Sequence, residues 1–300
     1  MRLQNRDAFS SYHPAVNFLY FGLVLFFTMC FLHPVCLLLS LAAALRYAVR
    51  LNGRQAVRCG LLYLLPMALL AALLNPAFNH KGATILTYLP SGNPLTLESV
   101  AYGLAAAALL SAVVTWFSCY TAVMTSDKFV YLFGRVIPAL SLVLSMALRF
   151  VPRFQAQARV VSQAQRCVGR DVSDGSLLQR LRNGVTILSI LLTWCLENAI
   201  ETADSMKSRG YGLPGRTAFS IYRLDGRDRT ALWCLGALGG YILSMWRAGG
   251  FACRYFPTFR LAPWDGWSLS GLLAFGLLCL TPVIIDRRED RRWTRLPSIT

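Results

Sequence analysis

Ala203-Asp-Ser-Met-Lys-Ser-Arg-Gly-Tyr211 is a charged helix end in an otherwise apolar chain. A second end of the same build, Ala164-Gln-Arg-Cys-Val-Gly-Arg-Asp171, precedes it in the sequence. Each combines a helical run, a small residue, cationic side chains and a glycine that can end a helix in the left-handed conformation. Two such tips predict a pair of rigid helices that dock against a partner in water, and they favour binding over catalysis.

The composition places the chain among membrane proteins. Of its 300 residues, 55% are hydrophobic and only 15% are charged, which is more apolar surface than a soluble protein can bury. The 30 Lys and Arg residues outnumber the 14 Asp and Glu residues, giving a net charge of +16. In a soluble protein this excess would suggest nucleic acid. In a membrane protein it indicates basic cytoplasmic loops, so no nucleic-acid partner is expected.

The hydropathy pattern predicts six transmembrane helices. Arg46, Arg50, Arg54 and Arg58 follow the second span, and a basic stretch at residues 286–292 follows the sixth, so both termini are expected in the cytoplasm of a multi-pass cell-membrane protein. Arg247, Arg254 and Arg260 would lie in an outer loop, against the same bias. The predicted spans are residues 16–32, 34–45, 60–74, 100–124, 231–246 and 267–285.

The middle of the chain has a different character. Residues 126–230 hold 15 of the 30 cations and 8 of the 14 acids. Their apolar runs, residues 136–148 and 185–196, are short for a span and continue into charged helix. The sequence therefore predicts an all-α polytopic protein in three parts: N-terminal spans at residues 1–125, a membrane-apposed cytoplasmic domain with a pair of long helices at residues 126–230, and a C-terminal hairpin of spans at residues 231–300.

The first long helix is expected to leave the membrane at Arg149-Phe-Val-Pro-Arg153. Pro152 would kink or restart it, so Arg149, Pro152 and Arg153 form a predicted exit and hinge. The helix should end near Gly169, and a turn at residues 171–176 should lead into a second helix at residues 177–208.

An acidic stripe lies on the second helix, because Glu197, Glu201 and Asp204 are spaced i, i+4 and i+7. The stripe could hold a partner or relay protons, but a stabilising pairing with the basic helix that crosses it is favoured. Lys207 and Arg209 occupy the last turn, where the helix dipole favours cations. Arg209 could cap carbonyls, contact lipid headgroups or bind carboxylates of a partner in a bidentate manner.

These residues resemble a known family. Ser208-Arg209-Gly210, within Ala203-x-x-Met206-x-x-Arg209-Gly210-Tyr211, resembles the second Ala-Arg-Gly signature of the transmembrane T components of energy-coupling factor (ECF) transporters, the CbiQ/EcfT family. Leu148-Arg-Phe-Val-Pro152, followed by residues 164–171, resembles the segment with the first signature. The resemblance is specific over residues 145–212, whereas the flanking spans match only in number and hydropathy.

The resemblance implies a non-enzymatic scaffold. The two coupling helices would insert into grooves of two ATP-binding-cassette (ABC) ATPase subunits, and the scaffold would grip a small membrane S component that binds a vitamin or a metal ion. ATP and Mg would be bound by the partner ATPases, and this chain would hold no cofactor and no metal. A cobalt/nickel-type permease subunit of the same family is an alternative. The implied coupling residues are Arg166, Cys167, Val168, Gly169, Arg170, Ser208, Arg209 and Gly210.

The chain departs from the family pattern at two positions. Ser208 replaces an alanine, which exchanges one small residue for another. At the first tip, Cys167-Val168-Gly169 aligns with Ala-Arg-Gly, so the arginine itself is missing. Arg166 and Arg170 flank the gap, and the sequence leaves open which of them takes its place.

Other classes of function are less well supported by the sequence. A polytopic enzyme acting on lipid-linked substrates would need convergent catalytic groups, and the sequence contains no HExxH, DDxxD or Ser-His arrangement. A stand-alone carrier would ordinarily place ionisable residues within its spans, and the predicted spans contain almost none. The scaffold is therefore the expected function.

Overall fold

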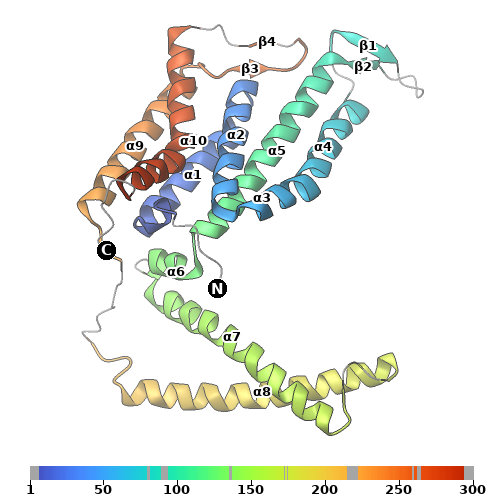
Figure 1. Cartoon of the computed structure of the whole chain (residues 1–300), viewed down its shortest axis with the longest axis vertical. Helices are drawn as coiled ribbons and strands as arrows, with labels where there is room; N and C mark the ends of the chain where they lie inside the picture. The colour runs from blue at the N-terminus through green and yellow to red at the C-terminus, as the bar shows by residue number, and fades with distance from the viewer. Residues whose placement is uncertain are drawn as a thin grey trace. The chain divides into compact units, whose positions relative to one another are not determined.

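The described part of the protein is helical apart from two pairs of short strands and the connecting loops (Figure 1). A computed structural model describes residues 7–79, 82–88, 94–134, 137–171, 173, 175–214, 222–258, 260–261 and 265–293. The chain divides into two compact units, Met1–Thr125 with Tyr222–Thr300, and Ser126–Ile221. The N-terminal and C-terminal membrane segments, which the sequence suggested as separate parts, thus pack together in one unit.

The helices of the first unit begin where their residues favour it. Pro14 and Pro34 open α1 and α2 at the first helical position, where no backbone N–H is needed. His13 caps α1, its Nδ1 accepting from the backbone N–H of Ala15 at 3.2 Å. The helices of the unit are α1 (Pro14–Cys30), α2 (Pro34–Asn52), α3 (Arg54–Cys59), a π-helical turn (Gly60–Leu64), α4 (Leu65–Phe78), α5 (Leu97–Val123), α9 (Gly226–Arg247) and α10 (Gly266–Trp293), with a short 3-10 turn at Phe9–Ser11.

The core of this unit is aromatic, and several of its buried polar side chains bond to one another. Tyr20, Tyr47 and Trp116 are fully buried between the helices. The indole N–H of Trp116 donates to Ser40 Oγ at 3.0 Å, and that hydroxyl also bonds Thr28 Oγ1 at 2.9 Å. Such internal pairing suits helices in lipid, where no water is present to satisfy a polar group.

Helices α4 and α5 approach closely because small residues line their contact. A Cβ added to Gly103 of α5 would lie 2.6 Å from the carbonyl oxygen of Ala72 in α4, so only glycine fits there. The rest of α4 turns its apolar side chains outward, among them Leu69, Leu70 and Leu73. A helix so apolar all round is expected to face lipid or another membrane protein.

The two ends of the first unit differ in their connections. At one end, strand β1 (Ile85–Tyr88) pairs with β2 (Pro94–Thr96), and β3 (Cys253–Arg254) pairs with β4 (Arg260–Leu261). The two hairpin regions meet where Ala83 N donates to Pro257 O at 3.2 Å. Tyr255 also donates from its hydroxyl to Leu32 O at 2.7 Å, tying the second hairpin to the turn between α1 and α2.

The opposite end gathers the start of the first unit and the end of α10. The backbone N–H of Phe9 donates to Asp286 Oδ1 at 3.2 Å, and that of His13 donates to Asp228 Oδ1 at 3.2 Å. Burial lowers the pKa of His13, with the charge of Asp228 acting in the opposite direction. Residues 7–13 and Asp286 therefore lie at the same end of the unit.

Among the described residues, five helical segments are long and apolar enough to cross a membrane: Pro34–Asn52, Arg54–Phe78, Leu97–Val123, Leu177–Ser208 and Gly266–Arg291. The predicted spans differ from these at three helices, α1, α8 and α9. Helix α9 holds the predicted span at residues 231–246. The uncharged stretch between Arg229 and Arg247 is shorter than 18 residues, so every segment of that length within α9 includes one of these arginines. Helix α8, expected outside the membrane, is long and apolar enough by composition. Helix α1 is a shorter apolar helix.

The second unit consists of α6 (Ser126–Gly134), α7 (Pro138–Cys167) and α8 (Leu177–Ser208). Helix α8 has the predicted bounds, and α7 ends two residues before Gly169. Val136, where the first apolar run was placed, lies outside the described residues. Pro152 lies inside α7, which continues through it, so the predicted restart of the helix at this residue does not occur.

Candidate functional site: two helix tips

The end of α7 is a Schellman motif. The N–H of Gly169 donates to Arg166 O at 3.0 Å, and the N–H of Arg170 donates to Gln165 O at 2.9 Å. Gly169 has a φ of 77°, a conformation that costs little only for glycine. The last carbonyls of the helix are thereby satisfied by the chain itself, so no side chain at this tip is needed to cap them.

The end of α8 repeats this arrangement bond for bond. The N–H of Gly210 donates to Lys207 O at 3.1 Å, and the N–H of Tyr211 donates to Met206 O at 3.0 Å. Gly210 has a φ of 78°. Because backbone groups cap this helix as well, the guanidinium of Arg209 is not required to satisfy carbonyls.

The shared motif gives a residue-by-residue correspondence between the tips. Val168 and Arg209 are the last residues before the two left-handed glycines, and Cys167 and Ser208 are the preceding helical residues. This backbone register agrees with the sequence alignment of Cys167-Val168-Gly169 with Ser208-Arg209-Gly210. The first tip therefore presents an apolar side chain, 70% exposed, where the second presents an arginine.

The cations of the first tip are not equivalent. Arg166 Nε lies 2.8 Å from Oδ2 of Asp171. That carboxylate is only 15% exposed and also accepts from the N–H of Ser173 at 3.2 Å and its hydroxyl at 2.7 Å. The Asp171 carbonyl accepts from Nδ2 of Asn183 in α8 at 2.8 Å. Arg166 thus belongs to the turn that joins the two long helices.

Arg170 and Arg209 are exposed, and within the part of the chain that the structure describes their guanidinium groups have no ion-pair partner. Both can approach a carboxylate without first breaking a contact. The structure therefore offers one unengaged arginine at each tip, next to Gly169 on one and next to Gly210 on the other.

The acidic stripe of Glu197, Glu201 and Asp204 is also exposed. The predicted pairing with basic residues of α7 is not formed, because these carboxylates have no ion-pair partner among the described residues. The reason is where the helices cross. Phe154 of α7 meets Trp194 of α8 edge to face at 5.6 Å, so the stripe begins beyond the crossing.

Among the predicted exit and hinge residues Arg149, Pro152 and Arg153, Arg153 contacts α8 through its side chain. The guanidinium carbon of Arg153 lies 5.7 Å from the ring centroid of Trp194, a cation–π contact between the two helices. Arg149, one helical turn earlier, is exposed, as is Pro152. Arg153 therefore helps to fix the crossing, whereas Arg149 makes no ion pair in the described residues.

Helix α8 carries an exposed apolar surface along much of its length. Of the 18 consecutive residues of α8 with the highest mean hydropathy, only 11% are buried. Most of the apolar side chains of this helix are therefore not covered by the rest of the described chain. The exposed apolar side chains of α8 are Leu177, Leu178, Leu181, Val185, Leu188, Ile190, Leu192, Leu196 and Ile200. Exposed apolar surface of this extent indicates contact with lipid or another protein.

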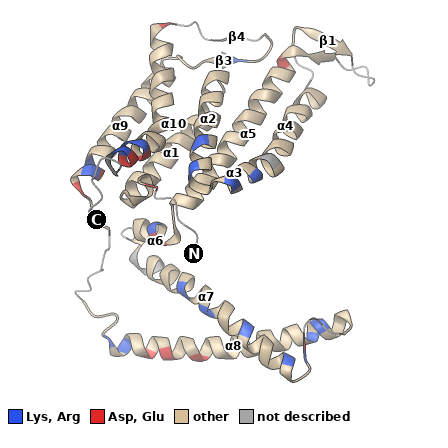
Figure 2. Cartoon of the chain, viewed as in Figure 1, with Lys and Arg blue, Asp and Glu red and all other residues tan. Residues whose placement is uncertain are grey.

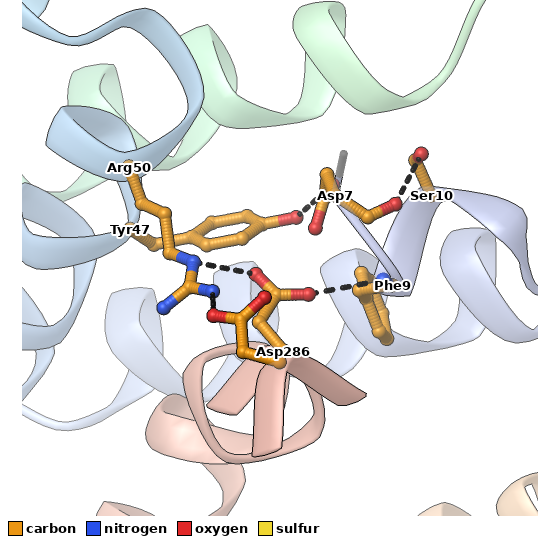
Figure 3. Close-up of polar contacts among 7 residues, drawn as sticks. Asp7, Phe9, Ser10, Tyr47, Arg50 and Asp286 are labelled. Atoms are coloured by element: carbon orange, nitrogen blue, oxygen red, sulfur yellow. Dashed lines mark hydrogen bonds and ion pairs between the residues drawn. The ribbon is translucent and has the colours of Figure 1, made fainter. Parts of the chain in front are cut away.

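A polar cluster in the first unit was missed by the sequence reasoning (Figure 3). Asp286 of α10 is buried, and its Oδ2 lies 3.3 Å from Arg50 Nε in α2. Arg50 also pairs with Asp290 one turn later, and Asp7 accepts from the hydroxyl of Tyr47 at 3.0 Å. The i, i+4 spacing of the two acids in a stretch assigned as a basic tail was the signal that could have revealed it.

No group of three or more His, Cys, Asp or Glu side chains that could hold a metal ion occurs within the described residues. The buried carboxylate of Asp286 is already occupied by Arg50 and by the N–H of Phe9. Asp286 thus holds α10 against α2 and against residue 9.

Comparison with known proteins finds a matching family and several relatives. The family model described as "CbiQ: Cobalt transport protein" matches residues 10–219. An "Energy-coupling factor transporter transmembrane protein EcfT" from Lactobacillus helveticus is 36% identical over 108 residues, covering 36% of this chain and 39% of that protein. A protein of the same name from Exiguobacterium sibiricum is 34% identical over 113 residues, covering 37% and 42%.

A third relative, "Energy-coupling factor transporter transmembrane protein EcfT 1" from Listeria monocytogenes, is 37% identical over 83 residues, covering 27% of this chain and 31% of that protein. The aligned part of the chain spans about two fifths or less of the length of these curated relatives. The family model, by contrast, matches more than half of the chain.

Proposed function

The chain belongs to the CbiQ family of cobalt transport proteins, and we propose that it is the transmembrane coupling subunit, or T component, of an ATP-driven importer of the energy-coupling factor type. In this role it carries out no chemistry of its own. It transmits motion between two cytoplasmic ABC ATPase subunits, which bind ATP and Mg, and a small membrane S component, which binds the transported solute.

The observation that carries the proposal is the pair of matched helix tips. Helices α7 and α8 cross at Trp194 and end in the same Schellman motif, each with an unengaged arginine close to the cap. A self-capped, rigid helix end can enter a groove without losing its own hydrogen bonds. Because the two helices are packed together, a displacement of one tip is transmitted to the other.

The distribution of charge supports an orientation for the first unit. Its cations gather at the end where α2 and α10 finish, with Arg46, Arg50, Arg54 and Arg58 on or beside α2 and α3 (Figure 2). By the positive-inside bias, this end faces the cytoplasm. Residues 7–13 and Asp286 share that end, so both termini of this multi-pass chain are assigned to the cytoplasm of the cell.

The exposed apolar surface of α8 suits the membrane partner. An S component is itself a membrane protein, and α8 presents Leu188, Leu192 and Leu196, each more than half exposed. Lipid bilayer contacts the remaining apolar helices, including the outer face of α4. The solute, a vitamin or similar micronutrient, is selected by the S component and not by this chain.

The proposal is tested by purifying the full chain from membranes in which the ABC ATPases and small membrane proteins of the same genome are co-expressed. We expect two ATPase subunits and one small membrane protein to co-purify, and vesicles containing the complex to take up solute only with ATP. A chain that purifies alone, or that mediates uptake without ATP, would contradict the assignment.

A cobalt- or nickel-type permease subunit is the second candidate, favoured by the description of the matching family. The two candidates share the coupling mechanism and differ only in the solute delivered by the S component. Uptake of radioactive Co²⁺ or Ni²⁺ by the same vesicles, compared with uptake of labelled vitamins, separates them. Uptake of the metal alone would replace the vitamin assignment.

A further inference from the structure

The first tip has Val168 at the position where the second tip has Arg209. Val168 occupies the equivalent place in the Schellman motif and is 70% exposed. The side chain of Val168 is apolar, whereas the exposed side chains of Arg166 and Arg170 near it are charged. It suits a partner surface with an apolar floor more than it suits water.

Arg166 is a poor substitute for the missing arginine because it already has a function. Its ion pair with Asp171 counters a mostly buried carboxylate that also accepts hydrogen bonds from Ser173. If Arg166 turned towards a partner, this carboxylate would lose its counter-charge, and the turn between α7 and α8 would lose a contact. Docking through Arg166 would therefore break the ion pair with Asp171 that stabilises the turn next to this tip.

Arg170, in contrast, forms no ion pair among the described residues. It follows Gly169 directly, its N–H completes the helix cap by bonding Gln165 O, and its side chain is exposed. At the second tip the corresponding position is Tyr211, so the two tips place their free cation two residues apart along the same motif. The backbone of the two tips is the same, whereas the position of the charge is not.

We infer that Arg170 is the docking cation of the first tip and that Val168 makes an apolar contact in place of the second tip's arginine. This inference rests on the proposed function and names the recognition chemistry of one of its two contacts. The partner cleft at the first tip would hold a carboxylate at its rim for Arg170 and apolar side chains beneath Val168. The cleft at the second tip would place its carboxylate where Arg209 enters.

Cys167 and Ser208 supply a matched pair of probes. Cys167 is an exposed free thiol at the first tip, and Ser208 is the equivalent residue at the second. In a full chain carrying Ser208→Cys, maleimide labelling at positions 167 and 208 is measured peptide by peptide. The chain is labelled alone and in complex with the two ABC ATPases of the same genome, and both positions should be protected in the complex.

Arg170→Ala should raise labelling of Cys167 in the complex by about tenfold or more, because a charge-assisted contact is lost, while position 208 stays protected. Arg166→Gln should change labelling of Cys167 by less than about threefold. The double variant Val168→Arg with Arg170→Ala moves the cation to the place that it has in the second tip. We expect this variant to restore protection only in part, because the cleft is apolar beneath position 168.

The results separate this inference from the proposed function. Protection of both positions that Arg170→Ala does not alter, or an effect of Arg166→Gln as large as that of Arg170→Ala, overturns the role of Arg170 alone. Full restoration by the double variant overturns the apolar contact of Val168. Absence of protection at both positions in the unmodified complex overturns the coupling function and this inference with it. Equal labelling of the free variants shows that the tips remain folded.

Discussion

The two units of the molecule use charged residues in opposite ways. In the first unit, Arg50 of α2 is paired with Asp286 and Asp290 of α10, and the Asp286 side chain is only 1% exposed. In the second unit, Arg170 and Arg209 are exposed and have no ion-pair partner among the described residues. Charges that are paired internally hold helices in place, whereas unpaired charges on capped helix ends remain available to another molecule.

The same contrast recurs on a smaller scale within the second unit. Arg153 and Arg166 contact Trp194 and Asp171, and they stabilise the crossing and the turn of the two long helices. Arg170 and Arg209 lie at the ends that these contacts support. The second unit thus has two kinds of cation: those that stabilise the packing of α7 and α8, and those that are exposed at the helix ends and available to a partner.

The largest effect is expected at the second tip. Arg209→Glu replaces the free cation by an anion facing an acidic cleft, and it should weaken ATPase binding by about 2–5 kcal/mol, about 30-fold or more. Recovery of the ATPases with the tagged chain measures this effect. Arg180→Glu reverses the charge of another exposed arginine, near the start of α8; it is the control and should leave recovery unchanged. Equal losses in the two variants would mean that net charge, not the tip, governs binding.

The internally paired charges should affect stability and not docking. Arg50→Ala leaves the buried carboxylate of Asp286 without its counter-charge, and it should lower the free energy of unfolding of the first unit by about 2 kcal/mol. Unfolding by heat or denaturant in detergent measures this loss. Arg46→Ala removes an exposed arginine one turn earlier and should have little effect. Loss of ATPase recovery at unchanged stability in Arg50→Ala would break the contrast between the units.

The backbone of the tip is the next determinant. Gly210→Ala forces a side chain into a left-handed conformation that costs about 1–2 kcal/mol, so ATPase affinity should fall by about 5- to 30-fold as the cap opens. Gly184→Ala, in open space within α8, is the matched control and should instead stabilise the helix by about 0.5–1 kcal/mol. A Gly210→Ala chain that binds ATPases normally would show that the cap geometry is dispensable.

The smallest effect is expected at the helix crossing. Arg153→Ala removes the cation–π contact with Trp194 and should lower local stability by about 0.5–1 kcal/mol, seen as about two- to fivefold faster amide exchange around the crossing. Arg149→Ala, one turn away and exposed, should leave exchange unchanged. If both variants exchanged alike, the contact with Trp194 would not contribute to the rigidity of the pair.

Local signals in the sequence predicted the second unit well. The bounds of α8 and the helix-ending glycines Gly169 and Gly210 follow from residues that are neighbours in the chain, because helix caps are determined locally. The all-α class followed from apolar run lengths in the same way. The roles assigned to the individual tip residues remain predictions.

Contacts between distant parts of the chain were not predictable in the same way. Asp286 meets Arg50 only because α10 packs against α2, and no local pattern encodes that pairing. The expected partner of the acidic stripe failed for a similar reason, since the position at which α7 crosses α8 depends on the packing of Phe154 against Trp194. Pro152 was expected to kink or restart its helix, and of these two alternatives the continuous α7 excludes the restart.

The central claim is tested most directly by measuring access to both tips in one chain. In the full chain carrying Ser208→Cys, maleimide labelling of positions 167 and 208 is compared before and after assembly with the two ABC ATPases. Cys195, partly exposed in the middle of α8, serves as the internal reference. We predict that assembly protects both tips and leaves Cys195 unchanged. Tips that label equally in the free and assembled chain would contradict the coupling function.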